Sequence, residues 1–197
     1  ASDSAYEGSA SFTIIRSAPS NATIATGTVT SNIVDNGTGT GGSDNDTPTL
    51  GVSSPTVGEA GGFAVFTLSL SNPSATATTV SLALADGATS PALGGGADYG
   101  SATATNLQVS TDGGTTWSNA TNATFAAGAT SVLVRTPVVN DAFDETDETF
   151  SLTATRTAGT TSNASASGTA TITDNDAQPA LAINDVTVNE AAGTMTF

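Results

Sequence analysis

The chain has 197 residues, of which 37% are hydrophobic and only 5% aromatic, and it carries 18 acidic against 3 basic residues. The net charge of −15 argues against binding to nucleic acid or anionic membrane surfaces, because phosphate binding requires clustered Lys and Arg. The chain has no Cys and no His, which excludes disulfides, thiolate zinc sites, Cys or Ser–His nucleophiles and imidazole bases.

The first segment of the chain repeats a later one. Residues 2–37 resemble residues 140–176, and three positions coincide: Asp3 with Asp141, Glu7 with Glu145, and Phe12 with Phe150. Residues 47–66 resemble residues 178–197 in the same way, sharing Pro-x-Leu, Val-x-Glu-Ala and a final Phe. We therefore expect three parts: the C-terminal part of one unit plus a linker in 1–46, a complete unit in 47–176, and the N-terminal part of the next unit in 177–197.

The complete unit has strand-like patterns throughout and no helical periodicity over about 11 residues. In chain order, the predicted strands and hairpin occupy residues 49–57, 63–71, 79–87, 105–118, 130–139, 148–156 and 166–174. About seven short strands separated by turns predict an all-β fold of tandem antiparallel β-sandwiches. Each partial unit should hold about two strands, which cannot bury a face alone, so their partners come from further chain or from neighbouring molecules. The chain begins with Ala, and we favour further chain on both sides.

Four acidic segments are expected to meet at one end of the sandwich. Residues 141–148 hold five acids between two strands, and residues 173–176 end a strand that should run antiparallel to 149–156. Glu59 follows the first strand, and Asp98 lies in a Gly-rich turn. The available ligands are all oxygens, which suits a hard cation. A site built from loops favours Ca²⁺, because Mg²⁺ demands a stricter octahedron.

Four motifs in this order resemble the Calx-β domain: "VGEAGG…F" (57–63), "GADYG" (96–100), "VVNDAFDETDETFSL" (138–152) and "ATITDND" (170–176). The resemblance spans the complete unit, and the two end segments match the tail and head of the same domain. It implies a seven-stranded, immunoglobulin-like sandwich. The Thr- and Ala-rich style is similar to the tandem repeats of giant secreted bacterial adhesins of the RTX type and of surface fibres.

The resemblance also implies a set of calcium ligands. These would be Glu59, Asp98, Asp141, a main-chain carbonyl near Phe143, Glu145, Glu148, Asp174 and Asp176. Asp144 and Asp147 should face solvent instead. In the first partial unit, Ala10 stands in place of Glu148 and Gly37 in place of Asp176, so a weaker or lost site is expected there unless residues 43–46 supply a substitute.

The leading functional hypothesis is a structural repeat of an extracellular filament or adhesin at the bacterial cell surface, with a role in biofilm adhesion. Its partners would be calcium ions, which rigidify units and joints, and neighbouring repeats of the same chain or fibre. The alternative is a calcium-dependent module that binds a glycan or receptor, for which an exposed Trp117 would be support. No nucleophile motif or cofactor loop accompanies the carboxylates, so we expect no enzyme. No run of about 18 apolar residues is present, so no membrane span is expected.

Overall fold

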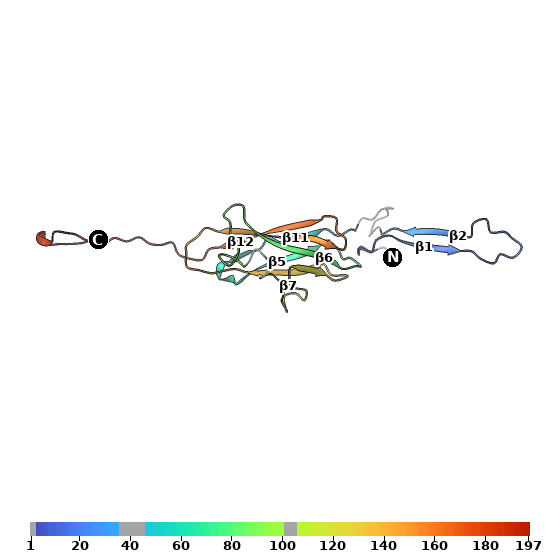
Figure 1. Cartoon of the computed structure of the whole chain (residues 1–197), viewed down its shortest axis with the longest axis horizontal. Coiled ribbons are helices and arrows are strands. Elements are labelled where there is room, and N and C mark those ends of the chain that lie inside the picture. Colours follow the sequence, from blue (N-terminus) through green and yellow to red (C-terminus); the bar gives the residue numbers. More distant parts are fainter. Residues whose placement is uncertain (1–2, 36–45, 101–105) are drawn as a thin grey trace.

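A computed structural model of the chain describes residues 3–35, 46–100 and 106–197. Within these residues, two five-stranded sheets face each other as a β-sandwich (Figure 1). This arrangement confirms the predicted all-β sandwich class. The division into units at 1–46, 47–176 and 177–197 remains a prediction. Among the described residues, the structure contains no helix with the length and hydropathy needed to cross a bilayer.

The first sheet has the order β3-β5-β10-β7-β8, and every neighbouring pair in it is antiparallel. Its strands are β3 (Leu50–Val52), β5 (Phe63–Leu70), β10 (Ser131–Pro137), β7 (Gln108–Ser110) and β8 (Ser118–Asn119). The second sheet has the order β4-β12-β11-β6-β9. Its strands are β4 (Thr56–Gly58), β12 (Ser165–Thr173), β11 (Glu148–Ala158), β6 (Thr78–Asp86) and β9 (Asn122–Phe125). The predicted set of strands missed β9, whose sequence "NATF" is too short to show alternation.

The segment predicted as one strand at 49–57 is divided between the two sheets. Its first part, β3, pairs antiparallel with β5, and its second part, β4, pairs parallel with β12. The crossing is held by side chains: Ser53 Oγ accepts from the Thr67 amide, and Ser54 Oγ accepts from the Thr169 amide. Because β4 lies against the end of β12, the residue after β4, which is Glu59, is placed beside residues 174–176.

The core fills the space between the sheets, as the alternation of apolar residues predicts. Phe66, Leu68 and Leu70 of β5 and Val80, Leu82 and Leu84 of β6 are all buried. Phe150 of β11 lies at the centre, stacked on Tyr99 at 4.1 Å between ring centroids and packed edge-on against Phe66 at 5.9 Å. Aromatic pairs in these geometries stabilise a core beyond the area they bury. The Tyr99 ring therefore ties the Gly-rich turn at 93–100 to the core.

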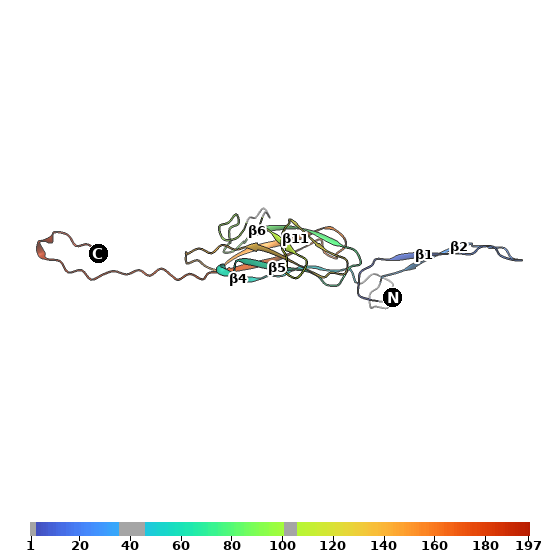
Figure 2. The same ribbon diagram turned by 90° about the horizontal axis from the view of Figure 1, so that it is seen from below.

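A separate hairpin of β1 (Ala10–Ile15) and β2 (Thr28–Ile33) projects from one end of the sandwich, and the C-terminal segment leaves from the other end (Figure 2). Phe12 pairs with Ser31 and Ile14 with Val29. In the sequence repeat these positions correspond to Phe150 with Ala170 and Leu152 with Gly168, which are pairs of β11 and β12. The hairpin thus has the register of β11–β12, but its large apolar side chains are exposed.

Residues 177–197 form no strand, so the expectation of about two strands there is wrong for this structure. An extended segment without a neighbour leaves its backbone groups unpaired and gains nothing over other conformations. Local structure is nevertheless shared with the complete unit. The 3₁₀ helices η1 (Glu59–Gly61) and η2 (Glu190–Ala192) occupy equivalent positions. Each is followed by a glycine with positive φ, Gly62 at 77° and Gly193 at 73°, a conformation that glycine adopts without steric cost.

Candidate metal centre

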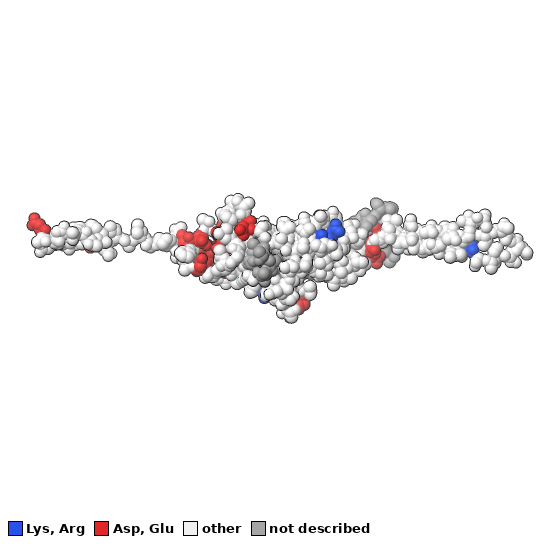
Figure 3. All heavy atoms as spheres, in the orientation of Figure 1, with Lys and Arg blue, Asp and Glu red and all other residues white. Residues whose placement is uncertain are grey.

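Acidic side chains gather at the end of the sandwich from which the C-terminal segment leaves (Figure 3). At this end β4 and β12 finish and β11 begins, so the loops that join them converge. The structure brings six of the eight expected ligand residues into two groups. In each group, one carboxylate oxygen per residue lies within 4.8 Å of the others.

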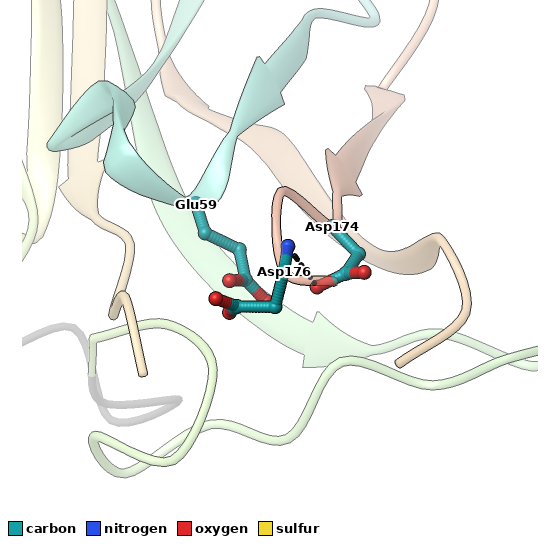
Figure 4. Close-up of side chains that lie close together, drawn as sticks. All are labelled: Glu59, Asp174 and Asp176. Atoms are coloured by element: carbon teal, nitrogen blue, oxygen red, sulfur yellow. Dashed lines mark hydrogen bonds between the residues drawn. The ribbon is translucent and has the colours of Figure 1, made fainter. Parts of the chain in front are cut away.

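The first group consists of Glu59, Asp174 and Asp176 (Figure 4). Glu59 begins η1, directly after β4, and the two aspartates follow the last residue of β12. The Asp176 amide donates to Asp174 Oδ1 at 3.2 Å, which holds the 174–176 turn closed. Glu59 is only 7% exposed. Its Oε2 and Asp176 Oδ2 are buried without a hydrogen-bond partner among the described residues, a costly arrangement for carboxylates.

The second group consists of Asp98, Glu145 and Glu148. Asp98 is held in its turn by three hydrogen bonds: Leu93 N donates to its Oδ2 at 2.6 Å, its amide donates to Leu93 O, and its carbonyl accepts from Val139 N at 2.9 Å. Glu148 is the first residue of β11, opposite Ile172. Its carboxyl group lies beside that of Asp98 at the start of this strand.

The remaining two expected positions lie outside these groups. Asp141 Oδ1 accepts from the Phe143 amide at 2.8 Å, which makes a tight local turn. The Asp141 charge raises the pKa of both Glu59 and Glu145, so this carboxylate lies near both groups. Phe143 has its side chain exposed, as do Asp144 and Asp147. The expectation that Asp144 and Asp147 face solvent therefore agrees with their exposure.

The chain matches the model of a known domain family, Calx-beta, described as the Calx-beta domain. Two segments match it, residues 43–119 and 117–178, and together they cover well over half of the chain. The chain belongs to the Calx-beta family. The two segments meet near the β7–β8 hairpin. None of the curated proteins compared with the chain matches it significantly.

Solved structures similar to this Calx-beta chain have low sequence identity. The calcium-binding domain CBD12 of CALX1.1 is 18% identical, with a TM-score of 0.46, and the match covers 64% of this chain and 44% of that one. CBD12 from CALX1.2 is 19% identical, with a TM-score of 0.43 and coverage of 63% and 42%. The E. coli chaperone DraB is 11% identical, with a TM-score of 0.38 and coverage of 64% and 55%. The chain thus spans less than half the length of the two CALX structures.

The electrostatics of this Calx-beta site are those of carboxylates without a countercharge. Burial, and then the charges of Asp174 and Asp141, raise the pKa of Glu59. Burial and the same kind of repulsion raise the pKa of Glu145. Burial together with Asp98 raises the pKa of Glu148 to about 7. Every charged neighbour that shifts these three groups is itself a carboxylate. Such a cluster is stabilised by protons or by cations.

The raised pKa of Glu148 predicts a pH dependence of the metal-free protein. Its pKa in the unfolded chain is near 4.5, so between about pH 4.5 and pH 7 the folded state binds a proton that the unfolded state releases. Stability should therefore rise as the pH falls through this window. We expect the melting temperature of metal-free protein, followed by circular dichroism, to be higher at about pH 5 than at about pH 8.

Glu148→Gln provides the control for this pH effect, because glutamine does not titrate. The variant should lose part of the difference between the two pH values, whereas Asp147→Asn at an exposed neighbour should keep it. A metal-free wild type that melts at a lower temperature near pH 5 than near pH 8 would contradict the assignment.

One positioning contact, made by Tyr99, was missed by sequence reasoning. The Tyr99 side chain is fully buried, and its hydroxyl donates to Asp86 Oδ1 at 2.6 Å. This bond and the Gly94 amide lower the pKa of Asp86, while burial raises the pKa of Tyr99. Asp86 is the last residue of β6, so this contact anchors the turn that carries Asp98 to the end of that strand. The adjacency of Asp98 and Tyr99 in "GADYG" was the sequence signal that could have pointed to this positioning role.

Proposed function

We propose that the acidic end of this Calx-beta sandwich binds calcium, and that the chain serves as a structural repeat of an extracellular bacterial adhesin or surface filament. The observation that carries the calcium proposal is the buried, unpartnered pair of oxygens on Glu59 and Asp176. One carboxylate oxygen of each of Glu59, Asp174 and Asp176 lies within 4.8 Å of the others. A cation would supply the partner that each oxygen lacks.

The donor set favours calcium among the common ions. Its ligands are carboxylates from loops and from strand ends, without nitrogen or sulfur, which suits hard cations. Calcium accepts six to eight oxygens in flexible geometry. The two groups, with Asp141 near both, offer seven carboxylates in one region: Glu59, Asp98, Asp141, Glu145, Glu148, Asp174 and Asp176. Exposed carbonyls of the 141–148 loop, including that of Phe143, would complete the coordination.

The structural role follows from where the site lies. Asp174 and Asp176 lead directly from β12 into the segment that leaves the sandwich. An ion held by this turn and by Glu59 would fix the direction in which the chain continues toward the next repeat. Extracellular modules bind calcium with dissociation constants of roughly 0.1–1 mM, close to the concentrations outside cells. The proposed location and the partners, calcium and neighbouring repeats, rest on the repeated sequence and on its resemblance to the repeats of bacterial adhesins.

Isothermal titration of calcium into the metal-free 197-residue chain tests the proposal directly. We expect saturable binding with a dissociation constant of roughly 0.1–1 mM and much weaker binding of magnesium. Glu59→Gln should weaken binding by at least about tenfold, because a buried ligand charge is removed. Asp144→Asn, an equal change of charge at an exposed position, should leave the affinity within about twofold. Absence of saturable binding, or equal losses in both variants, would reject the site.

A further inference from the structure

A second set of side chains lies on the outer face of the first sheet, away from the carboxylate groups. Val65, Arg135, Gln108 and Asn119 are directly opposite one another on β5, β10, β7 and β8. Residues opposite one another on adjacent strands share a face of the sheet. The row is therefore a continuous surface feature built on strands. It contains one of the chain's three basic residues.

The Arg135 guanidinium is held between two aromatic rings. Its central carbon lies 3.9 Å from the centre of the Phe63 ring and 4.1 Å from the centre of the Trp117 ring. Its Nε donates to Gln108 Oε1 at 2.8 Å. The Trp117 indole N–H is itself tied to the Gly114 carbonyl at 3.0 Å. Cation–π contacts on both faces and one hydrogen bond along the edge leave the two terminal nitrogens as the free donors of a preorganised fork.

The neighbouring amides extend the chain of hydrogen bonds that begins at Arg135. Gln108 accepts from Arg135 and donates through Nε2 to Asn119 Oδ1 at 3.2 Å. The Asn119 Nδ2 group then remains as a donor without a partner among the described residues. The terminal nitrogens of Arg135 likewise have no hydrogen-bond acceptor within the described part of the chain. Such a row of unused donors is complementary to a ligand that is rich in hydrogen-bond acceptors and carries a negative charge.

A shallow pocket adjoins this row. It is lined by Phe63, Asn106, Gln108, Asn119 and Pro137 and has a volume of about 280 Å³. Small-molecule sites begin at about 300 Å³, so this pocket suits a single ring-sized group. Phe63 supplies an apolar wall, and the three amides can each both donate and accept hydrogen bonds. A hydroxylated ring matches these walls better than a purely apolar ligand does.

We propose that this pocket binds a sugar unit bearing one carboxylate, with Arg135 paired to the carboxylate and the amides paired to the hydroxyls. Charge decides between a saccharide and an acidic peptide. The chain has a net charge of −15, so a ligand with several negative charges would be repelled. One guanidinium neutralises one carboxylate. The site is distinct from the calcium region and does not depend on calcium being bound there.

The single tryptophan of the chain makes the test direct, because fluorescence excited selectively at tryptophan reports on Trp117 alone. D-glucuronate is titrated into the full chain at constant ionic strength, with D-glucose and acetate as separate probes. We expect a saturable fluorescence change with glucuronate and at least about tenfold weaker responses to the neutral sugar and to the bare carboxylate. The side-chain amide signals of Gln108 and Asn119 should shift in parallel in a nuclear magnetic resonance titration.

Variants separate the proposed pairing from a general effect of charge. Arg135→Lys keeps the positive charge but loses the planar fork, and it should weaken glucuronate binding by at least about tenfold. Arg156→Lys is the matched control, because Arg156 lies on the other sheet and donates to the Gly159 carbonyl. Asn119→Asp, at an exposed position, should abolish binding by replacing a donor with a charge. Equal affinity for glucuronate and acetate, tighter binding of an oligoaspartate peptide, or no saturable response would each overturn the proposal.

Discussion

Saturating calcium is expected to raise the melting temperature of the metal-free chain by about 5–10 °C. A ligand present at about 100 times its dissociation constant stabilises the folded state by about 2.7 kcal/mol, and a domain of this size gains roughly 2–4 °C per kcal/mol. The physical reason is the burial of these carboxylates and the repulsion among them, which together raise the pKa of Glu59, Glu145 and Glu148 in the metal-free state. Bound calcium would remove this repulsion and would satisfy the buried oxygens. Differential scanning calorimetry with calcium and with a chelator measures the shift.

Limited proteolysis should reveal which part of the protein becomes accessible when calcium is removed. After chelation the protease should cut within residues 140–148, because that loop would contribute ligands but has few other contacts to hold it. Calcium should protect it. Magnesium at the same concentration is the control for ionic strength and should shift the melting temperature by less than half as much. A melting temperature that is the same with calcium and with chelator would contradict calcium binding to this end of the sandwich.

Replacing Phe150 by alanine is expected to destabilise the sandwich by about 3–5 kcal/mol, which would lower its melting temperature by roughly 10 °C. The ring is fully buried and contacts both Tyr99 and Phe66. Its loss leaves a cavity and removes the stacking partner of the residue next to Asp98. Calcium affinity should therefore fall as well, although Phe150 is not a ligand. Thermal melting and calcium titration of the same variant measure the two effects.

The chain offers a matched control for this substitution. Phe12 occupies the equivalent position in the β1–β2 hairpin but is 46% exposed. Phe12→Ala should change the stability of the sandwich by no more than about 0.5 kcal/mol, as is usual at exposed positions. If both substitutions cost the same, the two phenylalanines would be equally buried in solution. The burial argued for Phe150 alone would then be wrong.

Much of the fold was predictable because its signals are local. The alternation in 63–71 and 79–87 predicts β5 and β6 and the residues that they bury, since period two places alternate side chains on one face. The strand at 49–57 was predicted as one element, yet it divides between two sheets. Nothing in the residues themselves marks that division, because it depends on which edges are free to pair. The short strand β9 was missed for the related reason that its pairing with β6, and not its composition, defines it.

The sequence by itself determined the all-β class, the internal repeat, the family and the set of acids at loop ends, because these depend on residue types and spacing. Only the tertiary structure decided how the acids are grouped. It joins Glu59 to Asp174 and Asp176 through the parallel pairing of β4 with β12, and it joins Asp98 to Glu148 through the turn anchored by Tyr99. The row of side chains around Arg135 on the outer face of the first sheet also depends on cross-strand neighbours that are distant in sequence. Contacts between distant segments follow from strand pairing and packing, which no local pattern specifies.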